Sequence, residues 1–122
     1  MRTPMIAIVD DDDAVREALR QLVRSLGHNA STFASADEFL KSEQVSNTSC
    51  LITDVQMPGL SGLDLQDRLI AEGHRIPIIF LTGYPDENVR TRAMKAGAIG
   101  FLIKPPNHHD LVDHLEKALK AN

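Results

Sequence analysis

The sequence lacks the features that mark secreted and membrane-spanning proteins. Cys50 is its single cysteine, which excludes an internal disulfide and suits a reducing compartment. We expect this thiol to pack as a small apolar group beside Leu51 and Ile52. The first apolar run, Met5–Val9, is far shorter than a signal-peptide core, and no run approaches a membrane span. These absences predict a cytoplasmic protein that has no membrane partner.

Basic residues are too few and too scattered to form a nucleic-acid-binding surface. The chain has 13 Lys and Arg against 17 Asp and Glu, a formal net charge of -4. Phosphate backbones attract clustered cations, so we expect no direct nucleic-acid binding by this chain. Its 122 residues, 43% of them hydrophobic, suffice for one core. A single domain over residues 1–122 is predicted.

What the sequence does contain is an alternation of short apolar runs and amphipathic segments. The apolar runs are Met5–Val9, Asn29–Phe33, Cys50–Thr53, Pro77–Leu81 and Gly100–Ile103. Helical spacing of apolar residues predicts helices over residues 15–26, 35–41, 62–73, 89–96 and 111–119. Three of the runs are nearly unbroken, as expected of strands that are covered on both faces. The alternation predicts an α/β fold with parallel strands and right-handed crossovers.

Polar residues follow four of the five apolar runs. They are Asp10 and Asp11, Asp54, Thr82 and Lys104. Ligands of parallel sheets gather at the carboxyl ends of the strands, and neighbouring strands lie about 5 Å apart, so these side chains are expected to converge. Three carboxylates and one ammonium sum to two negative charges, which one divalent cation neutralises. Because every candidate ligand is an oxygen, magnesium or manganese is expected rather than zinc.

Such a pocket suits phosphoryl transfer. A metal ion held by few carboxylates keeps positions open for water or phosphate, and catalysis is then mainly positioning and charge stabilisation. One carboxylate could serve as the nucleophile and form an aspartyl phosphate. An aspartate after a strand, taken alone, is more often a turn or helix-cap residue, so the prediction depends on their joint placement.

Four stretches of the sequence carry the motifs of one protein family. They are IVDDDDAVREALRQLV, LITDVQMPGLSGLDL, IIFLTGYPD and AMKAGAIGFLIKP, in the family's order and at its usual spacings. With these stretches the chain resembles the receiver domain of two-component response regulators, and within that family the FixJ-type receivers. The resemblance covers essentially the whole chain. It implies a flavodoxin-like (βα)5 fold, a doubly wound five-stranded parallel sheet with strand order 2-1-3-4-5.

The resemblance also implies a role for each polar residue. Asp54 would be the phosphoacceptor, which attacks a phosphohistidine on a sensor histidine kinase or phosphotransfer protein. Mg²⁺, with Mn²⁺ as the alternative, would be held by Asp10, Asp11, Asp54 and the backbone carbonyl of Gln56. Lys104 would neutralise phosphoryl oxygens. The domain would catalyse only its own phosphoryl transfer and dephosphorylation, which makes it a signalling switch rather than a metabolic enzyme.

A second group of positions resembles the family's switch. Thr82 would donate a hydrogen bond to the phosphoryl group, and Phe101 would be the switch aromatic that turns inward in response. Tyr84 stands two residues after Thr82, where the family lines the path of hydrolytic water. The Lys104–Pro105 peptide bond stands where the family has a cis bond. These residues are expected to turn a local charge change into a change of conformation.

The resemblance places the signalling surface on the fourth helix, fifth strand and fifth helix. Related regulators often form homodimers through this surface, which makes a homodimer an option here. Its variable part includes Pro106, where close relatives usually have Phe. FixJ-type receivers usually precede a helix-turn-helix DNA-binding domain, so the expected output is control of transcription through a domain that this chain does not include.

One enzyme class competes with this interpretation. Asp10-x-Asp12 after a strand superficially matches the opening of magnesium-dependent phosphohydrolases of the haloacid-dehalogenase kind. That family continues with a Gly-Thr-like turn and has a later acidic motif. Here Asp13 and Ala14 follow, and no such acidic motif is present. The receiver is therefore the favoured prediction.

The four consecutive aspartates, Asp10 to Asp13, are expected to have two roles, metal binding and helix capping. Asp10 and Asp11 belong to the metal pocket, and Asp13 is expected to cap the first helix. Asp12 lies between them. We expect it to face solvent, with tuning of the metal site as the alternative.

Overall fold

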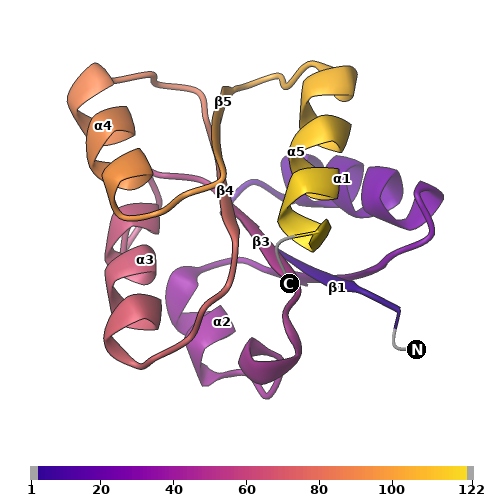
Figure 1. Cartoon of the computed structure of the whole chain (residues 1–122), viewed down its shortest axis with the longest axis horizontal. Helices are drawn as coiled ribbons and strands as arrows, with labels where there is room; N and C mark the ends of the chain where they lie inside the picture. The colour runs from indigo at the N-terminus through magenta and orange to yellow at the C-terminus, as the bar shows by residue number, and fades with distance from the viewer. Residues whose placement is uncertain (1–2, 121–122) are drawn as a thin grey trace.

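The computed structural model describes residues 3–120, so the ends of the predicted domain 1–122 lie outside the described residues. Strands and helices alternate along this stretch (Figure 1). The elements are β1 (Met5–Val9), α1 (Asp13–Ser25), β2 (Asn29–Phe33), α2 (Ala36–Lys41), the short 3-10 helix η1 (Val45–Asn47), β3 (Cys50–Thr53), α3 (Gly62–Ala71), β4 (Ile78–Thr82), α4 (Glu87–Lys95), β5 (Gly100–Ile103) and α5 (His108–Lys120).

The five strands form one parallel sheet in the order β2-β1-β3-β4-β5. This confirms the predicted flavodoxin-like topology. The strand order reverses at β1, so the ends of β1 and β3 lie side by side, with Val9 in register with Thr53. Residues that directly follow these two strands are therefore neighbours in space.

Both faces of the sheet are covered by helices, which explains the unbroken apolar runs. Helices α1 and α5 lie on one face, and α2, α3 and α4 lie on the other (Figure 1). Side chains alternate between the two cores: Ile6 and Ile8 face α1 and α5, whereas Ala7 and Val9 face the other layer. Cys50 is fully buried, and burial raises the pKa of its thiol to about 12, as expected of an apolar packing residue.

The structure shifts several predicted boundaries. The fourth strand begins at Ile78 and includes Thr82, because Thr82 pairs with Ile103 of β5. Helix α1 begins at Asp13 rather than at Val15, since its first turn is polar and carries no apolar period. Its predicted end is confirmed: Gly27 follows with a φ of 90°, a left-handed conformation that glycine adopts without strain.

Within residues 3–120, no helix is both long and apolar enough to cross a bilayer.

Candidate functional site

Three carboxylates gather at the carboxyl edge of the sheet. Asp10 and Asp11 follow β1, and Asp54 follows β3. Each offers a carboxylate oxygen, and these oxygens all lie within 4.8 Å of one another. Asp10 and Asp54 are 2% and 8% exposed, whereas Asp11 is open to solvent. The sheet topology thus brings together the three acidic residues that the sequence places in a metal pocket.

Lys104 reaches this cluster from β5, the edge strand of the sheet. It follows β5, and its ammonium group donates to Asp10 Oδ2 at 2.7 Å and to Asp54 Oδ2 at 2.8 Å. Burial alone lowers the pKa of Lys104, but hydrogen bonds and attraction from the two carboxylates outweigh it and raise the pKa above its usual value. The lysine is therefore a fixed positive charge at neutral pH. The Lys104–Pro105 peptide bond is cis.

A second basic side chain, Arg16 on α1, contacts the acidic loop that follows β1. The Arg16 guanidinium donates to the backbone carbonyl of Asp10 at 2.6 Å and also pairs with the carboxylate of Asp13. Oδ1 of Asp10 accepts a hydrogen bond from the Asp12 N–H at 2.9 Å. The Asp12 N–H thus holds one oxygen of the Asp10 side chain, and Arg16 holds the backbone of the same residue. The sequence alone does not single out Arg16, because a basic residue on an amphipathic helix is usually solvated.

The structure corrects the predicted helix cap. Asp12, not Asp13, is the N-cap of α1, and its Oδ1 accepts from the N–H groups of Ala14 and Val15 at 2.9 and 3.2 Å. Asp12 has the extended backbone of a cap, whereas Asp13 is already the first helical residue. Asp12 is exposed to solvent, as expected, but its carboxylate also serves as the cap. The error of one residue arose because any of four adjacent aspartates satisfies a cap preference.

This assignment predicts different stabilities for two neighbouring variants. Asp12→Ala should lower the free energy of unfolding by about 1 kcal/mol, because two N–H groups lose their acceptor. Asp13→Ala removes one exposed ion pair and should cost less than about 0.5 kcal/mol. Urea denaturation of both variants measures the difference. A larger loss for Asp13→Ala would restore the original cap assignment.

The turn after β3 is built tightly around Asp54. The N–H of Gln56 donates to Asp54 Oδ1 at 3.3 Å, and the N–H of Gly62 donates to the Val55 carbonyl at 2.8 Å. A Cβ at Gly62 would lie 2.1 Å from the backbone oxygen of Asp54, so only glycine allows α3 to start this close. This is the close helix approach that glycine permits. The predicted role of the Gln56 carbonyl as a metal ligand stays a prediction.

The proposed switch residues lie on β4, β5 and the loop after β4. Thr82 is fully buried, and its Oγ1 accepts a hydrogen bond from the Tyr84 N–H at 3.1 Å, while the Tyr84 side chain is 74% exposed. Phe101 is partly buried, with its ring centroid 6.2 Å from that of Phe80. The Thr82 oxygen accepts in this contact, which leaves the hydroxyl hydrogen to act as a donor.

The donor set at the sheet edge fits a hard divalent cation. All candidate ligand atoms are carboxylate or carbonyl oxygens, which suit Mg²⁺ and Mn²⁺. The ammonium of Lys104 offsets only one of the three negative charges. Asp10, Asp11 and Asp54 are thus the side chains that would hold such an ion.

Comparison with known proteins agrees with the fold. The chain matches the response regulator receiver domain over residues 6–116, and it belongs to that family. It is similar to the response regulator protein TodT of Pseudomonas putida, with 46% identity over 119 residues, 98% of this chain and 52% of TodT. It is also similar to the transcriptional regulatory protein FixJ of Bradyrhizobium diazoefficiens, with 36% identity over 94% of this chain and 56% of FixJ.

Solved structures give the same result. The response regulator StyR superimposes with a TM-score of 0.92 and 45% identity over 99% of this chain and 61% of StyR. The structure named FixJ-N gives a TM-score of 0.86 and 32% identity over 98% and 96% of the two chains. The predicted family is confirmed, and its members act in signalling rather than as metabolic enzymes. The chain spans about half the length of the curated relatives that it matches.

Proposed function

We propose that Asp54 accepts a phosphoryl group from a phosphohistidine of a sensor histidine kinase or phosphotransfer protein, in a reaction that requires Mg²⁺. The convergence of Asp10, Asp11, Asp54 and Lys104 in one pocket is the observation that supports this proposal. A carboxylate oxygen of Asp54 attacks phosphorus, the P–N bond breaks, and the histidine nitrogen leaves with the bonding electron pair. The product is an aspartyl phosphate.

The residues around Asp54 have separate duties in this step. Asp10, Asp11, Asp54 and the Gln56 carbonyl hold the metal, which supplies charge neutralisation for the transferring group. Lys104 already contacts Asp54 Oδ2, so its ammonium group can pair with a phosphoryl oxygen once Asp54 is phosphorylated.

Phosphorylation then acts as a local charge change on a two-state element. The carboxylate of Asp54 becomes a group with nearly two negative charges and new acceptor oxygens, which demand donors. We expect the Thr82 hydroxyl to move toward them and Phe101 to turn inward into the space that this movement opens. The resulting change reaches the face formed by α4, β5 and α5, which we propose as the signalling surface.

The proposed output is control of transcription. TodT is named a response regulator and FixJ a transcriptional regulatory protein, and this chain spans about half of each. We propose that residues 1–122 form one receiver domain of a cytoplasmic regulator whose DNA-binding domain lies outside this chain. A homodimer through α4, β5 and α5 is the assembly to test first, by sedimentation with and without phosphorylation.

Treatment with a small phosphodonor tests the proposed chemistry. In Mg²⁺ the purified chain should gain the mass of one phosphoryl group per molecule, and the adduct should be acid-stable and base-labile. Chelation of Mg²⁺ should prevent the gain. Continuous turnover of a phosphomonoester without a stable adduct would contradict the proposal and favour a phosphohydrolase.

The exposed Tyr84 side chain should control how long the phosphoryl group survives. We expect this bulky ring to shield the aspartyl phosphate from hydrolytic water, since the Tyr84 N–H bonds Thr82 beside the site. Tyr84→Ala should therefore speed dephosphorylation by about 3- to 10-fold, as loss of about 1 kcal/mol of barrier implies. Decay of the phosphorylated form, followed by mass spectrometry, measures this rate. Tyr84→Phe is the matched control, and an unchanged rate in Tyr84→Ala would refute the shielding role.

A further inference from the structure

Helix α4 buries few apolar side chains against the rest of the domain. Within α4, whose nine residues are all described, Ala93 is the only fully buried residue and Val89 is half-buried. By contrast, α3 buries five of its residues, among them Leu65 and Leu69. Burial of apolar surface therefore contributes little to holding α4 in place. The position of α4 depends more on polar contacts than that of α3 does.

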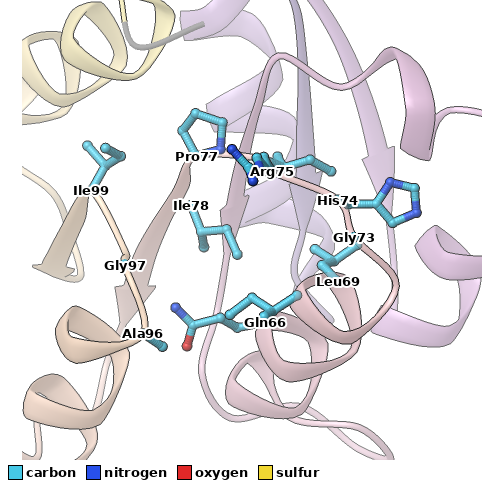
Figure 2. A pocket seen from close by; sticks show the side chains of 12 residues that line it. Gln66, Leu69, Gly73, His74, Arg75, Pro77, Ile78, Ala96, Gly97 and Ile99 are labelled. Atoms are coloured by element: carbon cyan, nitrogen blue, oxygen red, sulfur yellow. The ribbon is translucent and has the colours of Figure 1, made fainter.

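Two polar contacts from α3 hold α4. The Gln66 amide donates from Nε2 to the backbone carbonyl of Ala93 at 3.1 Å, and Gln66 is only 2% exposed. One position along, Asp67 pairs with Arg92 at 2.6 Å. Figure 2 shows the Gln66 amide projecting from α3 toward the end of α4 at Ala96, beside a groove of about 550 Å³.

The two contacts differ in what their loss would cost. Asp67 and Arg92 are both about half-exposed, so water can replace their ion pair. Gln66 is buried, and an amide left without an acceptor there pays its full desolvation penalty. The Ala93 carbonyl also accepts from the Ala98 N–H at 3.1 Å, so this carbonyl stays satisfied in either case. The penalty for moving α4 thus falls on Gln66.

Helix α3 also connects this contact to the candidate phosphorylation site. It begins at Gly62, directly against the backbone oxygen of Asp54. Helix α4 follows the loop that leaves β4 at Thr82 and carries Tyr84. Gln66 therefore joins α3, which starts against the Asp54 backbone, to α4, which follows the loop after Thr82.

We propose that Gln66 is a positioning residue that holds α4 in its unphosphorylated place and so sets the threshold of the switch. This inference rests on the proposed function, because it concerns the conformational response to phosphorylation of Asp54. In this proposal the responding position of α4 lacks the Gln66 hydrogen bond, so removal of that bond destabilises only the resting position and shifts the two-state equilibrium toward the response.

Gln66→Met tests the proposal because it keeps the volume and removes the donor. In the resting protein, hydrogen exchange of the α4 amides should accelerate by about 3- to 10-fold relative to α1 and α5. Beryllofluoride with Mg²⁺ mimics a phosphoryl group, and its titration midpoint, read by Tyr84 fluorescence, should fall by a similar factor. Gln66→Asn shortens the side chain and provides a second variant with the same expected result.

Two matched controls separate this role from general packing. Gln21→Met makes the same substitution on the exposed face of α1, and Asp67→Asn removes only the surface pair; both should change the midpoint less than about twofold. Equal acceleration in every helix with an unchanged midpoint would overturn the proposal and leave Gln66 a packing residue. A wild-type protein that ignores beryllofluoride would instead refute the proposed function, and the switch role of Gln66 with it.

Discussion

Asp54→Asn should abolish phosphorylation while leaving the fold intact. The amide has no anionic oxygen to attack phosphorus, so the rate should fall by on the order of 10³-fold or more. The fold should survive because the substituted amide oxygen can still accept from the Gln56 N–H or from Lys104, the two contacts that Asp54 makes at 3.3 and 2.8 Å. Removing one of three clustered carboxylates also relieves repulsion. Intact mass after treatment with a small phosphodonor measures the loss.

The matched control is Asp37→Asn, an exposed aspartate on α2 that lies outside the site. It should be phosphorylated at the wild-type rate. An Asp54→Asn variant that still gains a stoichiometric, base-labile phosphoryl group would move the acceptor to another carboxylate and contradict the assignment.

Asp11→Asn should weaken Mg²⁺ binding by about 10- to 100-fold. Asp11 is the exposed member of the cluster, so its carboxylate is accessible to a metal ion. The loss is one of affinity, and phosphorylation should therefore recover at high Mg²⁺ concentration. Recovery separates this variant from Asp54→Asn, in which no metal concentration restores the nucleophile. Calorimetric titration with Mg²⁺ gives the affinity directly.

Asp12→Asn provides the control for charge alone. It removes a neighbouring negative charge but keeps an oxygen that can cap α1, so Mg²⁺ affinity should fall only about twofold. If Asp12→Asn weakened Mg²⁺ as much as Asp11→Asn, the acidic loop would act through its overall charge and not through a defined ligand.

Much of the fold follows from patterns that the sequence displays locally. The apolar runs of β1, β3 and β4 are continuous because helices cover both faces, and alternation with helical segments restricts the sheet to parallel topologies. The strand order came from the family resemblance. The polar residues at the strand ends were predictable because parallel strands present their carboxyl ends at one edge.

The contacts that the sequence did not predict depend on tertiary structure. The Arg16 guanidinium reaches the Asp10 carbonyl from the first turn of α1, across the folded loop after β1. Gln66 finds its acceptor 27 residues further along the chain. One signal was available: Gln66 is three residues from both Leu63 and Leu69, so it falls on the apolar stripe of α3, where an uncharged amide needs a buried partner.

The most direct test of a phosphorylation switch uses the tyrosine that the sequence provides. The chain has no tryptophan and one tyrosine, so its fluorescence reports on Tyr84 alone, beside Thr82. Addition of beryllofluoride and Mg²⁺ should change this fluorescence in a saturable way, and the change should be absent without Mg²⁺ and in Asp54→Asn. The same fluorescence in the wild type with and without beryllofluoride, at saturating Mg²⁺, would contradict the account.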